Sequence, residues 1–169
     1  MASLHQPSPP PLHDDALQRV LDALAAADTC DRLDVLTTLC REAGYAGLAA
    51  LCADDEGRLR LALGVGLNAD GAAAGRGWSP GEGLAGRVFE TGQPVVLDGE
   101  RAAEELAGHP RLFAPEAEGE DRLLAVPIRE RGRVTGSLVA LRRHVAPGTV
   151  AVDDLRALAR VAPTLARVR

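Results

Sequence analysis

RLLAVPIRERGRVTGSLVALR, residues 122–142, decides the fold, because it reads as two strands joined by a short turn. The runs 123–128 and 134–141 are apolar and of strand length, and the residues ERG at 130–132 supply charge and a glycine that tolerates a positive φ. Neither run alternates cleanly between apolar and polar residues. We therefore predict a β-hairpin that is covered on both faces and lies in the middle of a sheet, with room for close backbone approach at Gly136.

The composition restricts the classes of function. A chain of 169 residues suits one domain with its own core. All 19 basic residues are arginine, which excludes lysine Schiff bases, lysine general bases and a P-loop. The formal net charge is −5, and acidic residues crowd segment 100–121. We therefore expect neither a nucleic-acid nor an anionic-membrane partner.

The cysteines indicate a reducing compartment. Cys30, Cys40 and Cys52 are odd in number, lack CxxC spacing and accompany no secretory signal, so we expect reduced thiols in a cytoplasmic protein. Cys40 lies on the apolar stripe of a predicted helix and is expected in the core. No apolar run reaches transmembrane length.

Catalytic and metal-ligating patterns are weak. The histidines share no ligand spacing, so no metal or other cofactor is expected. Ser79 and Ser137 have no evident histidine and carboxylate partners for a catalytic triad. We therefore expect a protein that is not an enzyme.

Periodicity and turn residues divide the rest of the chain. Residues 1–13 are proline-rich and predicted to form a disordered arm, and residues 14–169 form the domain. Five helices are predicted: one from residue 14, one from an Asp31 N-cap to Gly44, one over 83–91, one over 101–107, and one from a Thr149 N-cap with a kink at Pro163. Further strands are predicted at 47–53, 58–67 and 95–97. This order predicts an α+β fold with an antiparallel sheet.

Four segments resemble the GAF domain, a small-molecule sensor module of bacterial-type regulatory proteins. They are GEGLAGRVFETGQPVVL (81–97), HPRLF (109–113), RLLAVPIRERGRVTGSLVALRR (122–143) and DDLRALARVAP (153–163). The resemblance implies a six-stranded antiparallel sheet, with the terminal helices on one face and a ligand pocket on the other, beneath short helices and loops.

The sequence also departs from known GAF subgroups. Free methionine sulfoxide reductases of this fold carry a cysteine beside the glycine of the glycine-rich motif, where this chain has Ala85. The NKFDE motif of the cyclic-nucleotide type and the cysteine of the bilin type are absent. The sequence thus favours a stand-alone sensor over its alternative, a redox enzyme on the same fold, and a purely structural dimerisation module remains a third possibility.

The expected site lies around the glycine-rich motif. Trp78 and Leu84 flank it, Phe113 lies in the acidic loop, and Arg122 is expected to anchor a carboxylate or phosphate. The full set of expected ligand-binding residues is Trp78, Leu84, Val88, His109, Phe113, Arg122 and Leu124. The expected partners are an unidentified, mostly apolar small molecule, a second copy bound through the first and last helices, and a separate output protein.

Overall fold

The hairpin at residues 122–142 forms as expected, with strands β5 (Arg122–Glu130) and β6 (Arg133–Arg142) paired antiparallel. Arg131 and Gly132 both have positive φ values, 50° and 80°, which is the geometry of a two-residue hairpin turn that follows the twist of the strands. Gly136 is required for packing, because a Cβ there would collide with the carbonyl oxygen of Leu51 on the neighbouring strand. The turn and this glycine fix the register of the central strands.

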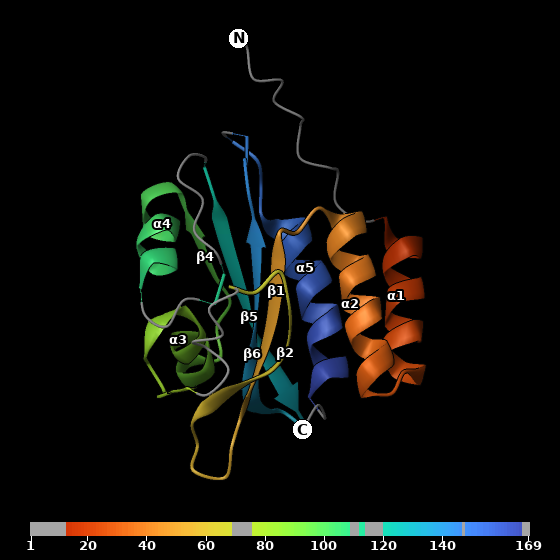
Figure 1. Cartoon of the computed structure of the whole chain (residues 1–169), viewed down its shortest axis with the longest axis horizontal. Helices are drawn as coiled ribbons and strands as arrows, with labels where there is room; N and C mark the ends of the chain where they lie inside the picture. The colour runs from red at the N-terminus through yellow and green to blue at the C-terminus, as the bar shows by residue number, and fades with distance from the viewer. Residues whose placement is uncertain (1–12, 69–75, 109–111, 114–119, 147, 167–169) are drawn as a thin grey trace.

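The computed structural model describes residues 13–68, 76–108, 112–113, 120–146 and 148–166. Figure 1 shows the element order. Besides β5 and β6, the elements are α1 (Asp14–Ala26), α2 (Thr29–Ala43), β1 (Gly47–Ala53), β2 (Leu59–Val65), β3 (Gly77–Trp78), α3 (Gly83–Thr91), β4 (Val95–Asp98), α4 (Gly99–Ala107), α5 (Val152–Val161) and the 3-10 helix η1 (Ala162–Leu165). All but residue 13 of the predicted arm lies outside the described residues.

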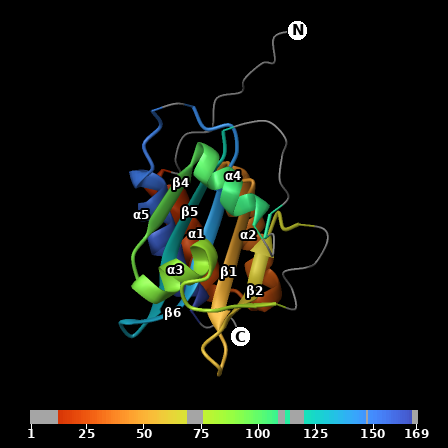
Figure 2. The same cartoon turned by 90° about the vertical axis from the view of Figure 1, so that its left-hand side faces the viewer.

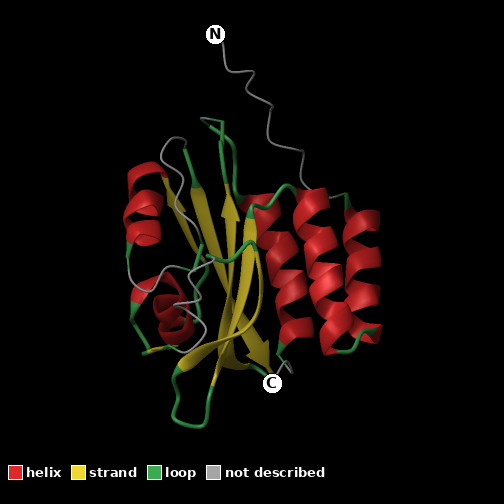
Figure 3. Cartoon of the chain, viewed as in Figure 1, coloured by secondary structure: helices red, strands yellow, loops and turns green. Residues whose placement is uncertain are grey.

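The strands form one six-stranded antiparallel sheet in the order β3-β2-β1-β6-β5-β4. Helices α1, α2 and α5 lie on one side of this sheet, and the short helices α3 and α4 lie on the other (Figures 1 and 3). Figure 2 shows α3 and α4 in front of the strands. The α+β architecture expected from the sequence is therefore confirmed. No helix in the described part of the chain is long and apolar enough to cross a membrane.

Each face of the sheet carries its own apolar core, because successive strand residues point to opposite faces. Leu124, Val126 and Ile128 of β5 belong to the core beneath α1, α2 and α5. Leu123 and Ala125 of the same strand belong to the core beneath α3 and α4. The hairpin is thus covered on both faces, as predicted.

Two predicted helix starts are wrong. Helix α2 begins at Thr29, and its capping carboxylate is Asp28, whose Oδ1 accepts a hydrogen bond from the Asp31 backbone N–H at 3.0 Å. Helix α5 begins at Val152 without a side-chain cap, and the Thr149 hydroxyl donates instead to the Ala146 carbonyl at 2.7 Å. Both helices form, but Asp31 and Thr149 are not their N-caps.

The expected kink at Pro163 takes a different form. The chain passes from α5 into the 3-10 helix η1, in which Pro163 occupies the first turn. A proline is tolerated in a first turn, because the backbone N–H that it lacks has no helical partner there.

Candidate functional site

A small cavity lies between the sheet and the two short helices. Its enclosed volume is about 40 Å³. Strands β5 and β6 form its floor through Leu123 and Val139. The complete lining is Trp78, Leu84, Ala85, Glu105, Leu106, Leu112, Phe113, Leu123 and Val139. The described lining is therefore mostly apolar, and Glu105 is the one charged side chain in it.

The Trp78 side of the wall is held by a short strand pairing. β3 pairs with β2, so that Trp78 lies opposite Leu59 at the edge of the sheet. The indole is buried and belongs to the core beneath α3 and α4. Trp78 therefore lines the cavity and also packs in this core.

Phe113 reaches the cavity because its backbone forms a bridge to the end of the β2 segment. Phe113 pairs with Leu67, and the Asn68 backbone N–H donates to the Leu112 carbonyl at 2.8 Å. Gly47 of β1 provides space for the ring, since a Cβ at that position would lie 2.5 Å from Cδ1 of Phe113. The aromatic ring is consequently buried against the sheet rather than exposed on a loop.

The first turn of α3 forms the opposite wall. Gly83 has a φ of 64° and directs Leu84 and Ala85 toward the cavity. The buried Ser137 hydroxyl of β6 donates to the Ala85 carbonyl at 2.7 Å, which ties this turn to the floor strand. Helix α3 then ends at Gly92, whose φ of 67° stops it as the sequence predicts.

Glu105 of α4 supplies the polar group of the cavity. Its Oε1 accepts a hydrogen bond from the Leu84 backbone N–H at 2.5 Å, and its Oε2 lies 3.9 Å from Nη2 of Arg87. The carboxylate therefore stands at the N-terminus of α3, where unpaired N–H groups favour a negative charge. This contact joins the two short helices that cover the cavity.

Of the seven residues expected at the site, the cavity brings together Trp78, Leu84 and Phe113. Val88 is buried in the same core but does not line the cavity, because it lies one helical turn beyond Leu84. His109 lies outside the described residues.

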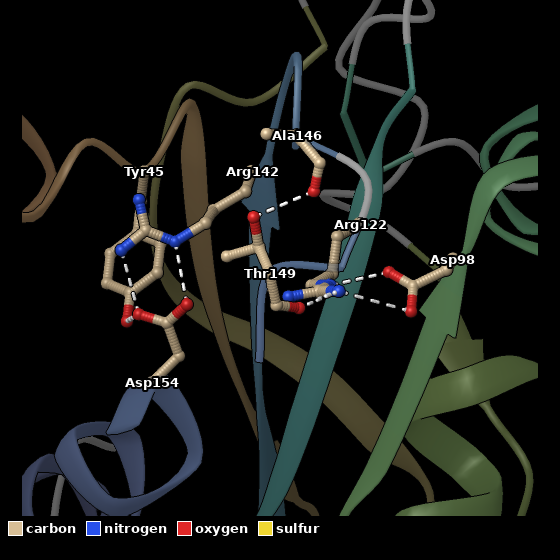
Figure 4. Close-up of polar contacts among 7 residues, drawn as sticks. All are labelled: Tyr45, Asp98, Arg122, Arg142, Ala146, Thr149 and Asp154. Atoms are coloured by element: carbon tan, nitrogen blue, oxygen red, sulfur yellow. Dashed lines mark hydrogen bonds and ion pairs between the residues drawn. The ribbon is translucent and has the colours of Figure 1, made fainter. Parts of the chain in front are cut away.

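Leu124 and Arg122 are placed wrongly by the sequence prediction. Both point to the face covered by α1, α2 and α5, because they are an even number of residues apart on β5. Arg122 Nε and Nη2 pair with the Asp98 carboxylate, and Nη2 also donates to the Thr149 carbonyl at 2.8 Å (Figure 4). Arg122 therefore joins the end of β4 to the segment before α5 and lies on the face of the sheet opposite the cavity.

The sequence prediction missed six of the lining residues. They are Ala85, Glu105, Leu106, Leu112, Leu123 and Val139. Leu123 could have been found from the sequence, because adjacent strand residues face opposite sides of a sheet and Leu123 must therefore face away from Leu124. Glu105 carries no such signal, since its contact with Leu84 joins two residues that are 21 positions apart and lie on different helices.

The described thiols lie away from the cavity. Cys40 is buried beneath the terminal helices as predicted, and Cys52 packs against that same core. Burial raises the pKa of the Cys40 thiol to about 11, so it is protonated at neutral pH. Among the residues that the structure describes, no group of three or more His, Cys, Asp or Glu side chains is arranged to hold a metal ion.

Comparison with known proteins gives a consistent result. The GAF domain family model matches residues 13–168. A search of curated proteins finds no match. The structure is similar to the GAF domain of a phosphoenolpyruvate-protein phosphotransferase from Coxiella burnetii, with a TM-score of 0.67 and 24% identity over 90% of this chain and 89% of that chain.

Two further solved structures share the fold. The GAF domain of the Acinetobacter phosphoenolpyruvate-protein phosphotransferase has a TM-score of 0.63 and 20% identity, covering 92% of this chain and 95% of that chain. Free methionine-R-sulfoxide reductase from Neisseria meningitidis, solved with its substrate, has a TM-score of 0.66 and 20% identity, covering 97% of this chain and 95% of that chain. With the family model spanning nearly the whole sequence and the same fold in these structures, this chain belongs to the GAF domain family.

Proposed function

We propose that this chain is a cytoplasmic sensory domain that binds a small molecule in the cavity beneath α3 and α4. The observation that carries the proposal is the cavity itself, which has an apolar wall, one carboxylate and an aromatic side chain on each of two separate segments. Such a combination of apolar surface with few polar groups is typical of small-molecule sites. GAF domains as a family are ligand-binding regulatory modules, which supports the same conclusion.

Strand β6 connects the cavity to the terminal helices on the other face of the sheet. Ser137 of β6 binds the first turn of α3 on the cavity face, while Arg142 of β6 binds Asp154 of α5 on the other face. A ligand that moves α3 would act on β6 and hence on the terminal helix. We propose that the signal is read there, by a second copy of the chain or by a separate output protein.

Native mass spectrometry tests the binding. Protein purified gently from its own source is expected to carry a ligand, and Ala85→Leu, which fills the cavity, is expected to lose it. Ala103→Leu, at an exposed position of α4, is the matched control and is expected to keep the ligand. Equal retention of a ligand by Ala85→Leu and the wild type would place the site elsewhere.

We propose that the chain does not reduce methionine sulfoxide. That chemistry needs a thiolate nucleophile beside the substrate. Ala85 stands in the cavity wall, and Cys40 and Cys52 pack with the core on the other side of the sheet. These two observations support a binding role over the enzymatic alternative.

A further inference from the structure

The cavity combines a carboxylate with two aromatic side chains. The sequence contains only four aromatic residues, and two of them, Trp78 and Phe113, line this one cavity together with Glu105. Aromatic rings attract cations through their negative faces, and Trp does so most strongly. A carboxylate beside two rings is a combination suited to a positive charge.

The Glu105 carboxylate retains capacity for a ligand. An ionised carboxylate has about four acceptor positions. In the described part of the chain, one is used by the Leu84 backbone N–H at 2.5 Å, and Nη2 of Arg87 at 3.9 Å lies beyond hydrogen-bonding distance. A ligand N–H group could therefore bind to the remaining acceptor positions of Glu105, which lines the cavity.

An anion is disfavoured at the same place. A ligand carboxylate would meet the negative charge of Glu105, while Arg122, the cation expected to receive it, lies on the opposite face of the sheet. Among the described residues, the lining contains no other charged side chain. The position of these two residues thus argues against the negative group for which Arg122 was the expected anchor.

The volume limits the size of the ligand. The cavity volume is about 40 Å³, far below the roughly 150 Å³ of an engineered cavity in another protein that binds benzene. An aromatic ring is therefore too large for this space, and the ligand must be small.

We propose, as a deepening of the proposed function and resting on it, that the ligand is a small organic cation. It is a short-chain ammonium compound whose N–H groups bind Glu105 and whose alkyl part lies against Trp78 and Phe113. Glu105 is then the residue that determines specificity for charge.

Titration with matched small probes tests this proposal. Because Trp78 is the sole tryptophan of the chain and lines the cavity, its fluorescence reports binding directly. The probes are propylammonium chloride, 1-propanol and sodium propionate, compared at constant ionic strength so that screening is equal. Propylammonium is expected to give a saturable change, 1-propanol a weaker one, and propionate none.

The decisive variant is Glu105→Gln, which retains an oxygen for the Leu84 N–H but removes the charge. It is expected to weaken propylammonium binding about tenfold, the loss of one charge-assisted contact, while 1-propanol binding stays unchanged. Glu104→Gln, its exposed neighbour on α4, is the control and is expected to bind like the wild type. Thermal unfolding of each variant confirms that it is folded, and Ala85→Leu is expected to abolish binding of every probe.

Three results would overturn the proposal. The first is propylammonium binding that is unchanged in Glu105→Gln. The second is propionate binding that is tighter than propylammonium binding, and the third is no propylammonium binding at all. If 1-propanol or an anion found by native mass spectrometry still binds and is lost in Ala85→Leu, the sensory function stands and only the charge assignment fails. If no probe binds and no ligand is found in the native protein, the proposed sensory function and the proposed cationic ligand both fail.

Discussion

Arg142 at the end of β6 and Asp154 in the first turn of α5 form an ion pair that is buried at both ends. Nε and Nη2 of Arg142 donate to Oδ2 and Oδ1 of Asp154 at 2.7 Å each. The Tyr45 hydroxyl donates to Oδ1 at 2.9 Å, and the Tyr45 ring centroid lies 4.5 Å from the guanidinium carbon of Arg142 (Figure 4). The pair thereby joins the central strand of the sheet to the last helix and to the segment before β1.

Breaking this pair is expected to be costly, because a buried charge without its partner is poorly solvated. Asp154→Asn is expected to lower the free energy of unfolding by about 3 kcal/mol, measured by urea denaturation. Asp153→Asn, the exposed neighbour, serves as the control and should change it by less than about 0.5 kcal/mol. A similar small effect for both variants would show that the pair contributes little to stability.

Stability is expected to fall in alkaline solution. The pKa of Cys40 rises on folding from 9.0 to about 11 because of burial, and burial, followed by the Asp154 charge, raises the pKa of Tyr45. Above about pH 9 the unfolded thiol loses its proton while the folded one keeps it. Deprotonation then stabilises the unfolded state and lowers the free energy of unfolding. The contribution of Cys40 is therefore complete below pH 9 and is lost as the pH rises through about 11.

Cys40→Ala separates this contribution from that of Tyr45. Urea denaturation of the wild type from about pH 8 to about pH 11 should show a fall in stability that is steeper than in the variant by roughly 1 to 3 kcal/mol over the range. A parallel pH dependence in the two proteins would mean that Cys40 titrates normally.

No reduction of free methionine sulfoxide is expected, because Ala85 offers no nucleophile at the cavity. Coupled NADPH oxidation with thioredoxin and its reductase is the measurement, with an active reductase as the positive control. Turnover that disappears in Cys52→Ser would show instead that the active site lies on the other side of the sheet.

A homodimer through the first and last helices stays a prediction. The stripes that suggested it are largely used within the chain, since Leu17, Val20 and Leu24 of α1 and Leu158 and Val161 of α5 are buried in the monomer. The exposed surface of these helices carries charged residues such as Asp15 and Arg156, so a dimer built on them should weaken with salt.

Light scattering at micromolar concentration measures this state. A dimer is expected at low salt, with dissociation as the ionic strength increases. Arg156→Glu should shift the equilibrium, whereas Arg133→Glu in the β5–β6 hairpin should not. A monomer at every salt concentration would contradict the prediction.

The sequence by itself determined most of the elements and the family. The 122–142 hairpin, the apolar stripe of α1 and the stop of α3 at Gly92 all depend on residues close together in the chain, so local pattern and turn chemistry suffice. The α+β arrangement follows from their order. The buried place of Cys40 was equally predictable from its spacing along α2.

The tertiary structure decided which residues meet. Alternation along β5 requires that Leu123 and Leu124 face opposite sides, but it does not say which side carries the cavity, and this is decided by the helices that pack on each face. Arg122 was expected beside a ligand and instead pairs with Asp98, because it shares the face of Leu124. Glu105 became part of the site only when α4 packed beside α3, since a contact between side chain and backbone across 21 residues leaves no local pattern in the sequence.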